Sequence, residues 1–387
     1  MMKIRDVQTI FLAKHLYVRV TTDNGLEGIG ECGTWGFLEA SAGAVEVFRE
    51  YLIGKDPLKI EYHWQYLYQS FCFRGAAIVG ALGAIDIALW DIAGKYYGVP
   101  VYRLLGGGDR CRDKLRAYCH VKSPSIEEHI RLIQEAKKKG FTAVGHLNPY
   151  LDPPKGEVAP VKPYAKRVSE AIEHVRQFRE VAGNDMDLCL EIHRRLDMAE
   201  AVALARGVEE FHPFFFEDPL MPDNIDTMGI LAGKIPIAIA TGERFISIQD
   251  FAMLFVRNGA QFARVSVCAI GGLTPSKKIA SMAEAFGIRV VPHNPGNLSP
   301  ISTAACVQFA ASIQNFAIQE IPADDGEGLK AEMVQTDVRV ENGYVMIPDS
   351  PGIGASLRNG VADHPKYAYA VRKAKATVLD DGSCGNR

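Results

Sequence analysis

The chain is 387 residues long, with 48% hydrophobic and 23% charged residues, so it can bury a large core and extensive disorder is excluded. Its formal net charge is −3 at pH 7 and no basic stripe stands out, which argues against a nucleic-acid partner. The N-terminus does not resemble a signal peptide and no run of 18 apolar residues occurs. We therefore expect a cytoplasmic protein with no membrane partner.

The first part of the chain, residues 1–112, has the pattern of a separate α+β domain. Residues 17–22 and 26–30 read as two strands joined through Asn24-Gly25, a pair that tolerates the positive φ values of a type I′ hairpin turn. Apolar residues then recur at helical spacing over residues 81–97, and a Gly-Val-Pro sequence ends the pattern. Strands followed by helices predict an α+β fold here.

From about residue 113 the pattern changes to a strict alternation of strands and helices. The candidate strands are residues 115–120, 143–147, 188–192, 214–217, 237–241, 262–267, 290–293 and 316–319. Mostly apolar strands that alternate with amphipathic helices indicate a parallel sheet covered by helices, and eight of them favour closure into a barrel. The connection over residues 148–163 is long and proline-rich, which is typical of a lid, a specificity element or a solvated insertion.

Three carboxylates stand at the ends of neighbouring candidate strands. Glu191, Glu217 and Glu243 each follow a run of mostly apolar residues, and successive members are 26 residues apart. That interval is about one strand, one helix and two short loops, so we expect all three at the carboxyl end of the barrel. Converging carboxylates repel one another unless a divalent cation lies between them, and Mg²⁺ prefers such oxygen ligands.

Several ordered motifs resemble the enolase superfamily, in its mandelate racemase-like branch, and within it the galactonate and mannonate dehydratase-like enzymes that act on acid sugars. The motifs are Gly83-Ala84-Ile85-Asp86-Ile87-Ala88-Leu89-Trp90-Asp91, Glu191-Ile192-His193-Arg194, Phe216-Glu217-Asp218-Pro219, Gly242-Glu243-Arg244, Gly271-Gly272-Leu273-Thr274 and Pro292-His293-Asn294. The resemblance implies an α/β fold with a (β/α)8-type (TIM-like) barrel over residues 113–321. It also implies a capping domain over residues 1–112, completed by residues 322–387, and a homo-oligomer.

The resemblance also implies a chemistry, in which a base removes the proton next to a carboxylate and Mg²⁺ stabilises the resulting enediolate. Glu191, Glu217 and Glu243 are the implied metal ligands. His193 corresponds to the general acid that protonates the departing 3-hydroxyl group. Glu320, at the end of the eighth strand, is expected to contact the substrate carboxylate or the enediolate, which requires a raised carboxyl pKa.

Two positions depart from the pattern of the resembling enzymes. His293 corresponds to the usual base, but the place of its Asp partner on the sixth strand is taken by Ser266, and a serine orients a histidine weakly. Near the end of the second strand, where relatives carry Lys or Arg, the nearest substitute is His146. We include His293 and His146 among the catalytic candidates. Three further residues are candidates either for contacts with substrate hydroxyl groups or for supporting the residues that make such contacts: Arg244, Asp218 and Arg195. Asn294 is a further candidate for a contact with a substrate hydroxyl group.

The prediction is a Mg²⁺-dependent hydro-lyase that converts an acid sugar, an aldonate, into a 2-keto-3-deoxy acid. One alternative is a racemase or epimerase of a 2-hydroxy acid, for which His146 would serve as the second base. The other alternative is a catalytically weak, metal-binding paralogue with a regulatory role, which Ser266 and the missing cation on the second strand favour.

Overall fold

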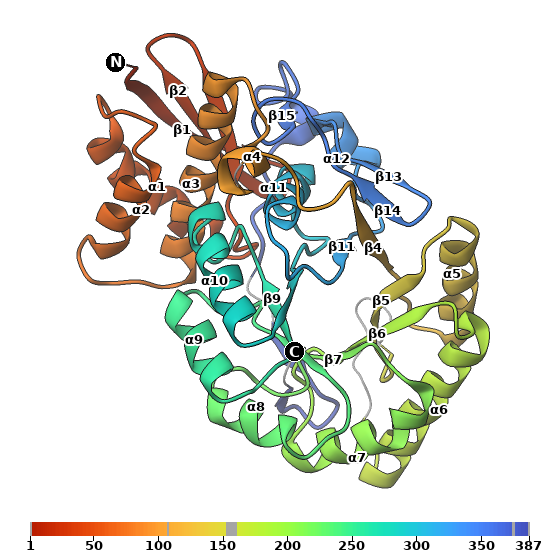
Figure 1. The fold of residues 1–387 in the computed structure, drawn as a ribbon. Helices are drawn as coiled ribbons and strands as arrows, with labels where there is room; N and C mark the ends of the chain where they lie inside the picture. The colour runs from red at the N-terminus through yellow and green to blue at the C-terminus, as the bar shows by residue number, and fades with distance from the viewer. Residues whose placement is uncertain (1, 107, 152–160, 374–375, 386–387) are drawn as a thin grey trace.

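The computed structural model describes residues 2–106, 108–151, 161–373 and 376–385, and part of the long connection at residues 152–160 therefore lies outside the described residues. An α+β domain packs against one side of a barrel, and the C-terminal segment runs over both (Figure 1). The predicted fold class, an N-terminal capping domain with an α/β barrel, is confirmed. The boundaries at residues 112 and 321 remain predictions.

The first domain is an antiparallel sheet covered by helices. Its strands are β1 (Ile4–Leu12), β2 (His15–Thr22) and β3 (Glu27–Glu31), and its helices are α1 (Leu38–Leu52), α2 (Ile60–Gln69), α3 (Ala76–Tyr97) and α4 (Val101–Gly106). The predicted hairpin is present, but its turn is not type I′. Gly25 has φ of 87° whereas Asn24 does not have a positive φ, and Gly25 donates to the carbonyl of Thr22 over 3.1 Å.

Helix α3 forms the centre of this domain because it is apolar on almost every side. By length and composition it could cross a membrane, but 78% of its apolar window is buried inside the protein, as in a core helix. Its close approach to β3 depends on two glycines. A Cβ atom at Gly28 or Gly30 would lie 2.0 Å from the carbonyl oxygen of Ala88 or Ala84, respectively.

The barrel follows the predicted alternation. Its strands are β4 (Lys114–His120), β5 (Ala143–Leu147), β6 (Asp187–Glu191), β7 (Phe215–Glu217), β8 (Ile239–Thr241), β9 (Phe262–Val265), β10 (Arg289–Pro292) and β11 (Gln319–Ile321). Neighbours pair in parallel, and β11 pairs with β4 to close the ring. The eighth strand was predicted too early, because Phe316 makes only an isolated bridge to Val290 before β11 begins.

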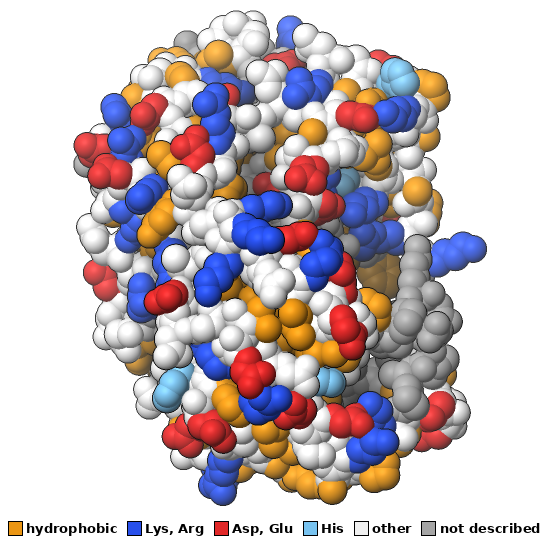
Figure 2. Space-filling view, turned by 90° about the vertical axis from the view of Figure 1, so that its right-hand side faces the viewer, with side chains coloured by type: hydrophobic (Ala, Val, Ile, Leu, Met, Phe, Trp, Pro, Cys, Tyr) orange, Lys and Arg blue, Asp and Glu red, His pale blue; other side chains and the backbone are white. Residues whose placement is uncertain are grey.

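Helices cover the outside of the barrel (Figure 1). They are α5 (Ile126–Lys138), α6 (Tyr164–Ala182), α7 (Met198–Val208) with η1 (Glu209–Phe211), α8 (Ile225–Ala232), α9 (Ile248–Val256), α10 (Leu273–Ala285) and α11 (Pro300–Ala311). On the face drawn in Figure 2, Lys, Arg, Asp and Glu side chains are interspersed over the described residues.

The C-terminal segment contacts both domains. It contains α12 (Gly328–Met333), β12 (Val334–Thr336), β13 (Arg339–Glu341), β14 (Tyr344–Met346), β15 (Ala355–Leu357), η2 (Pro365–Tyr367), β16 (Thr377–Val378) and β17 (Cys384–Gly385). Strand β14 pairs antiparallel with the beginning of β4. Ile353 donates its backbone N–H to Asp91 of α3 over 2.9 Å, so this segment joins the barrel to the capping domain.

A buried carboxylate of α3 fixes the barrel helix α10. The N-cap of α10 is Gly272, which has no side chain, and Asp86 of α3 accepts hydrogen bonds from the backbone N–H of Thr274 at 3.0 Å and from its Oγ1 at 2.5 Å. A Cβ at Gly272 would lie 2.3 Å from Asp86 Oδ2. Asp86 therefore caps α10 from the other domain. Burial raises the pKa of Asp86 to about 7.

We predict that Asp86 makes the stability of the protein depend on pH. Because its pKa is raised in the folded state, its ionised form is disfavoured there, and stability falls as the pH rises from its usual value of 3.8 to about 7. An Asp86→Asn variant lacks this titration. Urea unfolding at about pH 5 and about pH 7 should show wild type losing more stability than the variant. Equal losses would contradict the prediction.

Candidate active site

A cavity of about 660 Å³ opens at the carboxyl ends of the barrel strands. Its lining comes from the barrel, from the first domain and from the C-terminal segment: Trp35, His120, Lys122, His146, Glu191, His193, Arg194, Glu243, Arg244, His293, Pro295, Gly296, Asn297, Glu320, Ala376 and Gly385. The carboxyl end of a barrel is where parallel strands direct their loops and is the usual place of an active site in this fold.

The three predicted carboxylates converge. Glu191 ends β6, Glu217 ends β7 in register with it, and Glu243 follows β8 by two residues. All three are buried, and one oxygen of each lies within 4.8 Å of the others. Burial, and then the neighbouring carboxylates, raise the pKa of Glu191 well above its usual range. Burial raises the pKa of Glu217 to about 8, although Arg264 opposes this shift. Three hard oxygen donors that resist ionising together fit a divalent cation, so the trio is a candidate metal centre.

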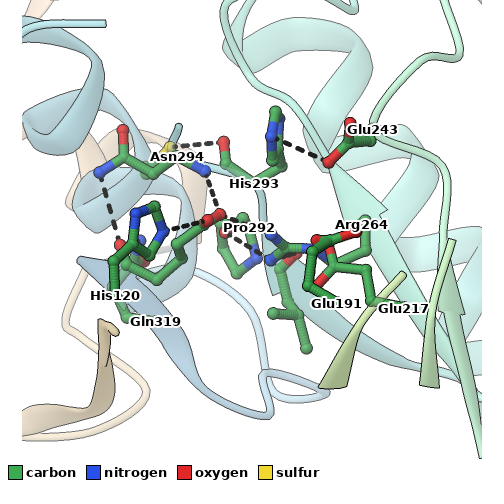
Figure 3. Close-up of polar contacts among 12 residues, drawn as sticks. His120, Glu191, Glu217, Glu243, Arg264, Pro292, His293, Asn294 and Gln319 are labelled. Atoms are coloured by element: carbon green, nitrogen blue, oxygen red, sulfur yellow. Dashed lines mark hydrogen bonds and ion pairs between the residues drawn. The ribbon is translucent and has the colours of Figure 1, made fainter. Parts of the chain in front are cut away.

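Two buried arginines partly balance this negative charge. Arg194 Nη1 lies 2.5 Å from Asp218 and 2.7 Å from Glu243. Arg264 contacts Glu217 through Nε and Glu320 through Nη2, the latter at 2.5 Å (Figure 3). Burial acts against the ionised form of Glu243, but His293 and Arg194 hold its pKa well below its usual range. The buried carboxylates still outnumber the two arginines, so negative charge remains that a bound cation would balance.

The expected charge state of Glu320 is wrong. Its carboxylate accepts hydrogen bonds from His120 Nε2 at 2.6 Å, from Arg264, and from the backbone N–H of Asn294 at 2.6 Å. Burial alone would raise its pKa, but Arg264 and then His120 lower it well below its usual range. Glu320 is therefore a hydrogen-bond acceptor here, and it holds His120 and Arg264 in place.

His120 and Arg264 were not predicted from the sequence as residues of the site. His120 is the last residue of β4, and Arg264 lies in the buried strand β9 with only 1% of its surface exposed. The sequence did contain a sign of Arg264, because a charged residue inside an apolar strand needs a buried partner of opposite charge. The identity of that partner depends on which strands face one another across the barrel, and spacing along the chain does not contain this information.

His146 and His193 lie together at the ends of β5 and β6. Their ring centroids are 4.6 Å apart, and the His146 ring stacks on His120 at 4.8 Å. Glu191 Oε1 accepts the backbone N–H of His193 over 2.9 Å, which fixes His193 beside the carboxylate trio. Burial, and then His120 and His193, lower the pKa of His146 well below its usual range, so its imidazole is neutral at pH 7.

His293 reaches the cavity with a different partner from the one its position suggests. Its Nε2 lies 3.1 Å from Glu243 Oε2 (Figure 3). Within the described residues, neither Ser266 Oγ nor His293 Nδ1 has a hydrogen-bond partner. Ser266 therefore does not take over the role of the missing Asp, and the carboxylate beside this histidine is Glu243.

The four candidates for hydroxyl contacts differ in where they lie relative to the cavity. Arg244 lines the cavity and its guanidinium lies 4.8 Å from the ring centroid of Trp35, a residue of the first domain. Asp218 and Asn294 are buried behind the lining, where their partners are Arg194 and Thr241 for Asp218 and Thr303 and Ser302 for Asn294. Arg195 is not among the described residues that line the cavity, whereas Lys122, which sequence analysis did not single out, is.

Residues 130–361 match the family described as Enolase C-terminal domain-like, and residues 4–106 match the mandelate racemase / muconate lactonizing enzyme N-terminal domain. The chain belongs to the enolase superfamily, in its mandelate racemase-like branch. This enolase-superfamily chain is 32% identical to a D-galactonate dehydratase of Verminephrobacter eiseniae, over 98% of its own length and 100% of that protein. It is 33% identical to a D-galactonate dehydratase of Ralstonia pickettii, with 92% of each chain covered.

Solved structures of the superfamily share this arrangement of domains. An enolase from Agrobacterium radiobacter, solved with Na and L-malate bound and an ordered active site, matches with a TM-score of 0.89 and 28% identity over 100% of both chains. A member of the enolase superfamily from Salmonella Typhimurium matches with a TM-score of 0.87, 28% identity, and coverage of 94% of this chain and 98% of that one. The resemblance stated from the motifs is confirmed.

We predict that the buried Arg264 bridge is needed for folding, because its removal leaves two buried carboxylates without their cation. Arg264→Met should lower the free energy of unfolding by about 3–5 kcal/mol. Arg257→Met is the matched control, because Arg257 forms a half-exposed pair with Asp226 and such pairs contribute at most about 1 kcal/mol. Chemical denaturation measures both. Equal losses in the two variants would contradict the prediction.

Proposed function

We propose that the chain is a Mg²⁺-dependent acid-sugar dehydratase that converts an aldonate into a 2-keto-3-deoxy acid. The observation that carries the proposal is the convergence of Glu191, Glu217 and Glu243 beside His193, at a cavity large enough for a small sugar acid. The relatives named D-galactonate dehydratase support the reaction class, and the relative solved with L-malate, a small 2-hydroxy acid, supports the substrate class.

The trio holds the metal in this proposal. An all-oxygen set of carboxylates suits Mg²⁺ better than a softer ion. When bound, the ion stabilises negative charge that develops on the substrate carboxylate. Arg194 and Arg264 position the carboxylates, since each contacts one member of the trio and one further buried carboxylate. The two arginines therefore keep the ligands together before the ion arrives.

Two histidines carry the proton transfers. His293 removes the C2 proton, and Glu243, at 3.1 Å from its Nε2, stabilises the imidazolium that forms. His193 protonates the 3-hydroxyl group, which leaves as water when the C3–O bond breaks. The enol product then tautomerises to the 2-keto-3-deoxy acid. His193 is held for this role by its backbone N–H to Glu191.

Other lining residues bind and orient the substrate. His120, which Glu320 fixes at 2.6 Å, supplies a polar contact for the substrate carboxylate or a neighbouring hydroxyl group. Lys122 and Arg244 supply positive charge elsewhere in the lining, and Trp35 packs on Arg244 and lies 6.1 Å from the His293 ring. Trp35 belongs to the first domain, so that domain helps to exclude water from the reaction.

We predict that the two histidine roles separate in D₂O. With an aldonate substrate and Mg²⁺, His193→Asn should lose about 10²–10⁴-fold of dehydration but still exchange the C2 proton, because the base is intact. His293→Asn should lose both. NMR of recovered substrate and an assay for 2-keto-3-deoxy acid measure the two steps. Exchange that persists in His293→Asn would show that another residue is the base.

The same assay distinguishes the alternatives. A racemase or epimerase incorporates deuterium with inversion at C2 and forms no 2-keto-3-deoxy acid. A regulatory paralogue binds acid sugars and turns over none of them. A screen of stereoisomeric aldonates with Mg²⁺ therefore tests the proposed reaction, and a dehydration product from at least one of them is the expected result.

A further inference from the structure

A second group of ligand atoms lies beside the carboxylate trio. One nitrogen of His146, one oxygen of Glu191 and one nitrogen of His193 all lie within 4.8 Å of one another. Glu191 also belongs to the trio with Glu217 and Glu243, so the two groups share one carboxylate. A carboxylate with two oxygens can bridge two neighbouring ions.

The backbone is bent to bring this group together. Strand β5 has a register shift against β6 between Val144 and Leu147, where two residues of β5 stand opposite one residue of β6. His146 lies in this bulge with φ of 59°, and His193 has φ of 56°. Left-handed backbone at residues with a Cβ is strained and persists where the surroundings impose it. The bulge turns the His146 side chain toward His193.

The neighbouring rings restrict the orientation of His146. It stacks on His120 with 23° between the ring planes, and the His193 ring stands nearly edge-on to it at 73°. His120 is itself fixed by Glu320. A ligand whose ring is held in this way loses less conformational freedom when a metal binds.

The donor atoms of the two groups differ in chemistry. Two imidazole nitrogens with one carboxylate oxygen favour Zn²⁺ and similar transition metals, whereas a purely carboxylate group favours Mg²⁺. His146 supplies one of the two imidazole nitrogens of the second group, and His193 supplies the other.

We propose that His146, Glu191 and His193 form a second metal site, which binds a transition-metal dication such as Zn²⁺ beside the carboxylate centre. The binding does not depend on the proposed reaction. One consequence of the binding does rest on the proposed reaction. A metal ion bound to His193 occupies the nitrogen that dehydration needs for proton transfer, so an ion at this site inhibits the enzyme.

The test is calorimetric titration of the full-length protein with ZnCl₂ and, separately, with MgCl₂. His146→Gln should weaken Zn²⁺ binding by about tenfold or more and leave Mg²⁺ binding unchanged, because the glutamine side chain is similar in size but lacks the imidazole. Glu217→Gln should weaken Mg²⁺ binding and leave Zn²⁺ binding unchanged, since Glu217 belongs only to the carboxylate trio. His212→Gln, which changes an exposed histidine after η1, is the matched control and should keep both.

Two results would overturn the proposal. Wild-type Zn²⁺ affinity in a folded His146→Gln variant would exclude this histidine as a ligand. Loss of Zn²⁺ binding in Glu217→Gln, with His146→Gln unaffected, would place Zn²⁺ in the carboxylate centre. If His146→Gln does not fold, His193→Gln provides the same test. Failure of the aldonate screen with intact Zn²⁺ binding would count against the proposed reaction and not against this site.

Discussion

The mutual repulsion of buried carboxylates is the constraint on which the rest of this structure depends. Glu191, Glu217 and Glu243 lie within 4.8 Å of one another in a buried setting, where the energy of unbalanced charge is large. Arg194 and Arg264 offset part of that energy, and a divalent cation offsets more. The barrel supplies the rigid strand ends that hold these groups against their repulsion, and the proposed proton transfers take place within the field of the same charges.

The first domain also takes part in the site. Glu31 of β3 accepts hydrogen bonds from the backbone N–H and the Oγ of Ser299, the latter at 2.7 Å, and His15 lies 2.8 Å from the same carboxylate. Ser299 caps α11 directly after the loop that contributes Pro295, Gly296 and Asn297 to the lining. Together with Asp86 on α10, this contact positions two barrel segments from outside the barrel. The capping domain is thus part of the scaffold of the cavity as well as its cover.

The strand order and the convergence of the three carboxylates could be predicted from the sequence because both depend on a regular period. A 26-residue interval between carboxylates is also the repeat of the barrel, so one pattern indicated both. Features that depend on contacts across the barrel were missed or wrong. Arg264 and His120 surround Glu320 and reverse its expected charge state, and Asn294 turns away from the lining toward buried partners. The bulge that contains His146 is likewise a local departure from strand alternation, and the spacing of residues along the chain could not predict it. The predicted homo-oligomer stays a prediction.

The most direct test of the central claim is anomalous diffraction from a crystal grown with Mn²⁺, an ion that binds where Mg²⁺ binds and scatters strongly enough to be located. We expect an anomalous peak bound by Glu191, Glu217 and Glu243 together, with Arg194 and Arg264 still in contact with their carboxylates. Carboxylates separated from one another with no peak between them would contradict it.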